Sequence, residues 1–149
     1  MKFIRYGQHF IEKKGEGVLA FINPHGYLDN PTFRGMRWNL LKNYDKIYTI
    51  DLHGNSKKKE TTPDGGKDEN VFDIQQGVSI NLLVKTGKKK ESELGEIFHF
   101  DAYGKREEKY QFLWDNKLKS VAFDKLPKVE PMYFMVQKDF EAEKLLSGF

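Results

Sequence analysis

The sequence lacks cysteine entirely among its 149 residues, which excludes a disulfide framework and any zinc site built on thiolates. It also lacks an apolar run near the roughly 18 residues that a membrane-spanning helix needs. Residues 1–6 show neither the extended hydrophobic region nor the cleavage site of an export signal. These absences predict a protein of one globular core with no membrane segment and a cytoplasmic location.

An excess of one charge is missing as well, because 25 lysines and arginines face 22 aspartates and glutamates. A polyanionic partner such as DNA is therefore permitted by the net charge but not required by it. The basic residues form two clusters, at Lys57, Lys58 and Lys59 and at residues 88–90. Lysines on flexible loops commonly bind phosphates without reading base sequence, and the alternative is a solvated loop.

Residues 15–52 read as a strand, a helix and a second strand in close succession. The apolar run 17–22 is bounded by turn residues, which is typical of a strand covered on both faces. Asn30 and Pro31 supply a helix cap and a first helical residue. Apolar side chains then recur at helical spacing, at Phe33, Met36, Leu40 and Tyr44. Residues 47–52 predict the second strand, reached by a right-handed crossover.

The flanking segments predict further elements of the same sheet. Residues 2–14 have the pattern of an amphipathic helix, and the alternation in residues 78–84 predicts a strand that pairs antiparallel with residues 47–52. Between these strands lies a long polar loop. The remaining expectations are a strand at 96–101, a short helix at 105–116, irregular strands at 121–123 and 132–136, and a last helix that begins at Asp139.

Four polar residues, His25, Asp29, Asp51 and His53, stand at predicted strand ends, where open α/β sheets bind their ligands. A metal-dependent or acid–base hydrolase could use such residues. Their spacing is unspecific, however, and the chain has no His-x-x-x-His pair and no Gly-x-Ser-x-Gly nucleophile motif. We therefore favour ordinary loop and capping roles for them and predict neither catalytic residues nor a metal site.

Phe72 stands at the junction between the polar loop and the strand at 78–84. An aromatic residue there either packs into the core or stacks on a planar ligand, and stacking on a base contributes about 1–3 kcal/mol. Asn23-Pro24-His25-Gly26 differs from the Asn-Pro-Pro-Tyr motif of amino-methylating DNA enzymes at its third and fourth positions. We therefore do not interpret it as a catalytic motif.

Four blocks carry a resemblance to a known family: GEGVLAFI at 15–22, GYLDNPTFRGMR at 26–37, DLHGNSKKK at 51–59 and NVFDIQQGV at 70–78. In this order they resemble the adenine-specific DNA methyltransferase region of bacterial restriction-modification proteins, especially type IIG and related single-chain types. The later part, through Trp114 and residues 131–136, is similar to the segment that leads toward target recognition.

The resemblance implies an α/β fold. Residues 1–103 would form the C-terminal portion of a Rossmann-like methyltransferase mixed sheet with an antiparallel last strand pair, and residues 104–149 a small mixed α+β extension. The complete enzyme would use S-adenosylmethionine and bind DNA. Because the glycine-rich cofactor loop and the Asn-Pro-Pro-Tyr turn are absent, the resemblance implies a fragment that neither binds the cofactor nor methylates DNA without its N-terminal methyltransferase half. The open edge of the strand at 17–22 could also lead to self-association.

The resemblance further implies that Phe72 closes on an adenine flipped out of the duplex. By implying a DNA-binding enzyme, the resemblance favours DNA contact over a solvated loop for Lys57, Lys58 and Lys59, and it assigns no catalytic residue to this chain. An alternative function remains, in which the chain is a free-standing module of methyltransferase ancestry that binds nucleic acid or a protein.

Overall fold

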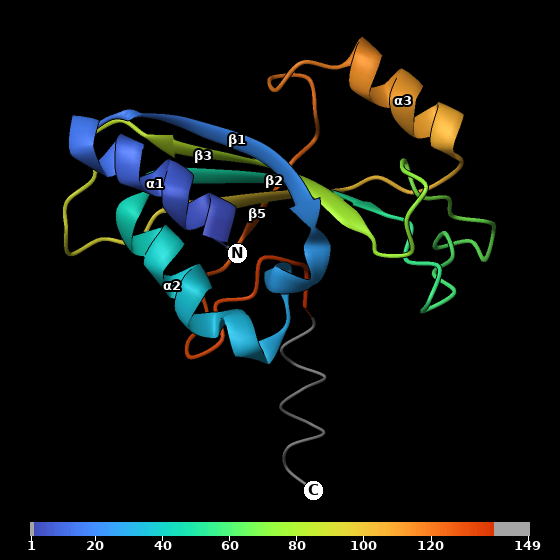
Figure 1. The fold of residues 1–149 in the computed structure, drawn as a ribbon, viewed down its shortest axis with the longest axis horizontal. Coiled ribbons are helices and arrows are strands. Elements are labelled where there is room, and N and C mark those ends of the chain that lie inside the picture. Colours follow the sequence, from blue (N-terminus) through green and yellow to red (C-terminus); the bar gives the residue numbers. More distant parts are fainter. Residues whose placement is uncertain (1, 139–149) are drawn as a thin grey trace, which may run out of the picture.

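The computed structural model describes residues 2–138, which form a five-stranded mixed sheet with helices on both sides (Figure 1). The helices are α1 (Lys2–Lys14), α2 (Arg34–Asn43) and α3 (Arg106–Asp115), with the short 3-10 helices η1 (His25–Leu28) and η2 (Pro31–Phe33) before α2. The strands are β1 (Gly17–Pro24), β2 (Lys46–His53), β3 (Val78–Lys85), β4 (Glu96–Asp101) and β5 (Asp124–Leu126).

The strand order is β1-β3-β2-β4-β5. β3 is antiparallel to both of its neighbours, and β2 is parallel to β4. β1, β2 and β4 therefore run in one direction, with β3 inserted against them. The predicted antiparallel pairing of residues 78–84 with 47–52 is confirmed, and so is the α/β fold class with an antiparallel strand in the last part of a methyltransferase-like sheet.

β1 differs from its prediction. Leu19 and Phe21 pack against the core, but Val18 is 57% and Ile22 51% exposed on the other face. The prediction that this strand is covered on both faces is therefore wrong. The reason is its position: β1 is an edge strand that pairs only with β3, and among the described residues no helix covers its outer face near Val18. The predicted open sheet edge is present.

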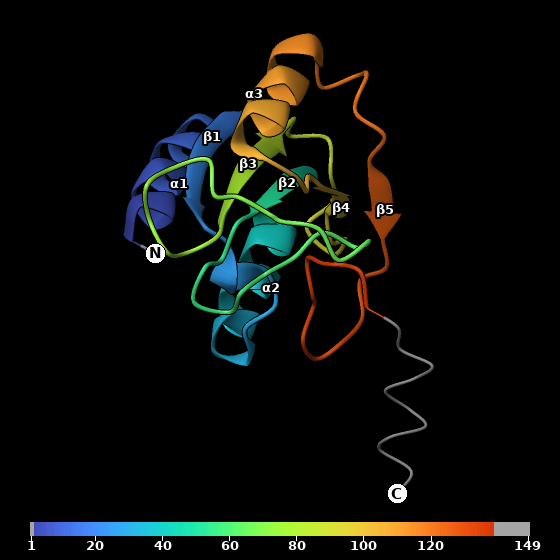
Figure 2. The same cartoon turned by 90° about the vertical axis from the view of Figure 1, so that its right-hand side faces the viewer.

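Two apolar clusters cover the two faces of the sheet. α1 and α2 pack on one face with the larger cluster, whose members include Ile4, Leu40, Leu41, Ile47 and Leu83. On the other face, Ile50, Leu52 and Val78 pack with Leu113 of α3. Figures 1 and 2 show the same division, with α1 and α2 together and α3 apart from them across the sheet.

The ends of the helices follow local chemistry. The Asn30 side chain accepts a hydrogen bond from the backbone N–H of Thr32 at 2.9 Å, which confirms the predicted cap, although a 3-10 turn precedes the α-helix. The helix predicted at 105–116 is confirmed as α3, where Glu108 accepts from the N–H of Lys105.

The second half holds less regular structure than predicted. Residues 121–123 and 132–136 form no strands, so those two predictions are wrong. The strand found in this part is β5, which pairs with β4. In 132–136 a left-handed Tyr133 (φ 49°) interrupts the extended backbone, and Met135 donates a hydrogen bond to the carbonyl of Leu28 instead of joining the sheet. The helix predicted from Asp139 lies outside the described residues.

The segment of residues 54–77, here called the β2–β3 loop, contains no helix or strand apart from an isolated bridge between Thr61 and Lys67, as predicted. No helix in residues 2–138 is both long and apolar enough to cross a membrane. The division of the chain between residues 103 and 104 stays a prediction. β5, from the later part, pairs with β4 of the earlier part in one sheet.

Candidate functional site at the carboxyl edge of the sheet

Polar residues gather where the parallel strands β2 and β4 end. Asp51 and His53 close β2, and His99 and Asp101 lie at the end of β4, where Asp101 pairs in register with Asp51 and His99 with Thr49. Because parallel strands end at the same edge, these side chains meet there. η1 follows β1 and brings His25 to the same edge, where its backbone N–H donates to the carbonyl of Gly77 at 3.0 Å.

A sharp turn after β2 sends the chain into the β2–β3 loop. His53 (φ 52°) and Gly54 (φ 82°) are both left-handed. A Cβ at Gly54 would lie 2.4 Å from the Cα of Asn70, so the close approach of the two ends of the loop requires glycine. This turn places Glu60 of the loop beside the ring of His53.

We call the group of His25, Asp51, His53, Glu60, His99 and Asp101 the carboxylate–histidine cluster. His53 lies at its centre and is only 7% exposed. Its Nδ1 is 2.5 Å from Glu60 Oε1, and its Nε2 is 2.7 Å from Asp101 Oδ1. His25 Nδ1 is 2.8 Å from Asp51 Oδ1, and His99 Nε2 is 2.9 Å from Asp101 Oδ1. The ring of Tyr103 stacks on His53 with centroids 4.1 Å apart.

The carboxylates govern the charge of this cluster. Burial by itself lowers the pKa of His53, but hydrogen bonds to Asp101 and Glu60 and the charge of Asp51 outweigh burial and raise that pKa to about 10. The pKa of His25 rises for the same reason: burial opposes the charge, and Asp51 more than compensates. Burial alone would raise the pKa of Asp101, but hydrogen bonds to His53 and His99 lower it instead. At neutral pH both nitrogens of His53 therefore carry protons and donate.

A cavity of about 410 Å³ opens over this cluster. All four sequence candidates, His25, Asp29, Asp51 and His53, line it, together with Glu60, Asp101 and Tyr103. The sequence interpretation placed these residues in separate loop and capping roles and did not anticipate Glu60, His99, Asp101 or Tyr103. One signal was available: a His and an Asp two residues apart end both β2 and β4, with reversed order.

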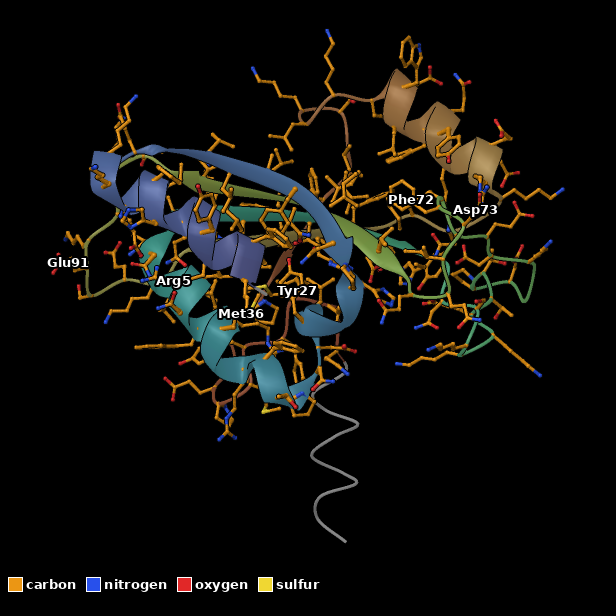
Figure 3. All side chains as sticks on the ribbon, in the orientation of Figure 1. Arg5, Tyr27, Met36, Phe72, Asp73 and Glu91 are labelled. Carbon is orange, nitrogen blue, oxygen red and sulfur yellow. The ribbon has the colours of Figure 1, made fainter. Side chains whose placement is uncertain are left out.

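Phe72 lies elsewhere on the β2–β3 loop and is 44% exposed. It borders a shallow groove of about 620 Å³ with Ser56, Ile74 and Arg106 and does not line the cavity over the cluster. Figure 3 shows Phe72 and Asp73 beside α3. Lys57, Lys58 and Lys59 are exposed on the same loop, and Lys58 also lines the cavity.

The residues around Phe72 hold its backbone on both sides. Its N–H donates to the side-chain oxygen of Asn70 at 2.9 Å, and its carbonyl accepts from Arg106 at 3.0 Å. Asn70 in turn donates to the carbonyls of Gly54 and Gln76. Thus the exposed ring of Phe72 is attached to a fixed backbone.

Helix α3 also holds the part of the β2–β3 loop just before Phe72, through a buried ion pair. Lys109 Nζ is 2.8 Å from Asp68 Oδ1, and the two side chains are 1% and 0% exposed. Lys109 also donates to the carbonyls of Leu52 and Glu69 at 2.6 Å. Every one of these partners lies in β2 or the β2–β3 loop, so α3 holds the loop against the end of the sheet.

Among the comparisons with known proteins, the matches come from solved structures. No protein-family model matches the chain, and no curated protein matches it. The structure is similar to a DrdV–DNA complex (TM-score 0.75, 26% identity, covering 93% of this chain and 13% of that chain). It is also similar to the ATP-dependent type ISP restriction-modification enzyme LlaBIII bound to DNA (TM-score 0.74, 27% identity, 92% and 9%).

A third structure, a nuclease-deletion mutant of the type ISP enzyme LlaGI with a DNA substrate mimic, shares the fold (TM-score 0.67, 21% identity, 87% and 12%). The chain spans 9–13% of the length of these three proteins. The likeness supports the restriction-modification origin implied by the resemblance of the four sequence blocks.

Proposed function

We propose that this chain forms the target-base side of an adenine-N6 DNA methyltransferase domain in a restriction-modification enzyme, with DNA as its partner. The observation that carries the proposal is the similarity over 93% of the chain to a structure solved with DNA. The sheet order agrees with it, because β3 runs antiparallel between β1 and β2 as in the last strands of the implied methyltransferase sheet.

In this proposal Phe72 stacks on an adenine that has left the duplex. Extruding a base costs a few kcal/mol, which contacts in the pocket must offset. A ring whose backbone is already fixed by Asn70 and Arg106 loses little conformational freedom on stacking. The 44% exposure of Phe72 leaves part of its ring accessible to a base.

Lys57, Lys58 and Lys59 supply the electrostatic part of the interaction. They stand on the same loop as Phe72, so a duplex whose base reaches Phe72 passes near them. Lysine contacts to phosphates position the duplex and carry no base specificity. Sequence recognition would then come from other parts of the enzyme.

The methyl donor would be S-adenosylmethionine, whose sulfonium supplies the methyl group and needs no metal. The residues described here do not fit a site for it. β1 runs directly into η1, β2 into the His53–Gly54 turn and β4 into Ala102, so none of these strand ends carries a glycine-rich loop. We propose that the cofactor binds to an N-terminal methyltransferase half, and that this chain alone neither binds it nor methylates DNA.

The proposal is tested with fluorescence anisotropy on the full chain and two labelled duplexes, one fully paired and one with an adenine opposite an abasic site. The unpaired adenine has no base pair to break, which lowers the cost of extrusion, so we expect tighter binding to the second duplex. Phe72→Ala should weaken that binding by about 5- to 150-fold, the equivalent of roughly 1–3 kcal/mol.

Phe10→Ala is the matched control, since Phe10 is an exposed phenylalanine on α1. It should leave both affinities unchanged. Equal binding by wild type and a correctly folded Phe72→Ala variant would refute the stacking role. Equal affinity for the two duplexes would favour the alternative, a nucleic-acid-binding module without a base pocket.

A further inference from the structure

We propose that the carboxylate–histidine cluster is a binding site for one divalent transition-metal ion, with Zn²⁺ as the best fit, held by His25, Asp51, His53 and Asp101. One ligand atom from each of His25, Asp51 and His53 lies within 4.8 Å of the others. These residues come from η1 and β2, and Asp101 comes from β4. The proposal goes beyond the DNA-binding function and does not depend on it.

The distances suit a tetrahedral ion. Zn²⁺ bound at about 2.0–2.1 Å places its ligand atoms roughly 3.3 Å apart. His25 Nδ1 and Asp51 Oδ1 are 2.8 Å apart, His53 Nε2 and Asp51 Oδ2 3.7 Å, and His53 Nε2 and Asp101 Oδ1 2.7 Å. These three separations bracket the required spacing, with His25 and His53 facing different oxygens of Asp51. The ligand atoms of His25 and His53 lie within 4.8 Å of each other, so the two imidazoles would move closer together to share one ion.

Residues behind the ligands have the arrangement typical of metal sites. A metal-bound histidine almost always donates its second ring N–H to a carboxylate, a carbonyl or water. His53 has Glu60 at 2.5 Å from its Nδ1, which leaves its Nε2 to face Asp51 and Asp101. His99 contacts the Asp101 carboxylate at 2.9 Å and so orients it.

The charge of the cavity also favours a cation. Four carboxylates line it, from Asp29, Asp51, Glu60 and Asp101, against the lysines Lys58 and Lys138 and the protonated His53. Asp51 is almost fully buried, with its side chain 4% exposed, and the imidazoles of His25 and His53 lie beside it. A bound metal ion would replace the protons that the imidazoles share with these carboxylates.

The ligand types select the class of metal. Mg²⁺ and Ca²⁺ prefer oxygen ligands, whereas imidazole suits zinc, copper, iron and nickel. A set of two imidazoles and two carboxylates with ligand atoms this close favours a small tetrahedral ion. Such an ion would join η1, β2 and β4 and, through Glu60, the β2–β3 loop.

The test is titration of the chelator-treated full chain with ZnCl₂ by calorimetry, and with Co²⁺ by visible absorption. We expect one equivalent of Zn²⁺ to bind, a higher melting temperature, and the intense visible bands of tetrahedral Co²⁺. Asp51→Asn and His25→Asn should each weaken Zn²⁺ binding at least about 10-fold, the scale seen for changes around metal ligands. His9→Asn, at an exposed histidine of α1, is the matched control and should bind like wild type.

His53 is buried, and substituting it risks unfolding the chain. The test therefore uses His25, which is partly exposed on η1, together with Asp51. Absence of stoichiometric binding would overturn the proposal. So would unchanged binding in folded Asp51→Asn and His25→Asn variants, since the metal would then bind elsewhere. Either result leaves the anisotropy experiment on Phe72 unaffected, so failure of the metal site and failure of the DNA function are distinguishable.

Discussion

Lys57, Lys58 and Lys59 stand on an ordered turn. The N–H of Lys59 donates to the carbonyl of Ser56 at 3.2 Å, and the N–H of Lys58 to the side chain of Asn55 at 3.2 Å. Glu60, which follows them, is held by His53 and by the N–H of Asn55. The lysine side chains are free to move in solvent, but their backbone is tied to the carboxylate–histidine cluster. Thus the position of these charges depends on the same residues that form the candidate metal site.

The first prediction concerns the salt dependence of DNA binding. Replacing Lys57, Lys58 and Lys59 together by glutamine should weaken duplex binding and reduce the slope of log K against log salt by up to about 3, since each phosphate contact contributes roughly 0.9. Anisotropy titrations at several salt concentrations measure the slope.

The matched control replaces the other cluster, Lys88, Lys89 and Lys90, by glutamine. These residues follow β3 at the end of the sheet opposite the site, as the positions of Glu91 and Phe72 in Figure 3 show. The control should keep the wild-type slope. If the slope became smaller in the control and stayed unchanged in the first variant, the phosphates would contact residues 88–90, and the prediction for Lys57, Lys58 and Lys59 would be wrong.

At the scale of elements, two side chains of α3 fix the β2–β3 loop by hydrogen bonds and ion pairs. Arg106 in its first turn donates to the carbonyls of Asn70 and Phe72 and to the Asp73 carboxylate, at 2.8, 3.0 and 2.8 Å. One turn later, Lys109 holds Asp68 and the end of β2. A loop without regular secondary structure thereby gains fixed hydrogen-bond partners from a helix.

The second prediction follows from these contacts between α3 and the β2–β3 loop. Arg106→Gln removes the bonds to the Phe72 segment but keeps Lys109, so we expect faster amide hydrogen exchange in residues 69–77 with only a small change in global melting temperature. Affinity for the duplex with an unpaired adenine should fall because the ring of Phe72 is no longer fixed. Arg34→Gln, at an exposed arginine that begins α2, is the control. Unchanged exchange in residues 69–77 would show that Asn70 alone fixes the loop.

The elements themselves were largely predictable from sequence. The alternation in residues 78–84 gave β3 and its partner, and capping chemistry gave the start of the helical segment at Asn30, because these signals are local. The carboxylate–histidine cluster was not predictable, since His53 meets Asp101 across 48 residues through strand pairing. The error at β1 has a related cause: the apolar run does not reveal the strand order, and β1 is an edge strand whose face with Val18 and Ile22 is exposed.

At the scale of the whole molecule, the two edges of the sheet differ: one ends in the short strand β5 and the other in the eight-residue strand β1. β4 is covered along its outer edge by β5, whereas β1 pairs with β3 alone. Beside this open edge, Val18 and Ile22 are exposed on the face that α1 does not cover, and they lie opposite Val84 and Ile80 of β3. Unpaired backbone groups next to exposed apolar side chains form a surface to which another strand can add.

The last prediction is that the isolated chain self-associates through β1. In the proposed methyltransferase, the N-terminal half of the domain would cover this edge; without it, a second copy can supply the pairing strand. Sedimentation velocity should show a concentration-dependent dimer. Val18→Lys should shift the equilibrium to monomer, because a charge on a sheet edge opposes pairing. Leu118→Lys introduces the same change at an exposed leucine after α3 and should leave the dimer intact. Sedimentation as a monomer by the wild-type chain at all concentrations would show that the edge is protected, and dissociation by Leu118→Lys alone would place the interface beside α3 instead of at β1.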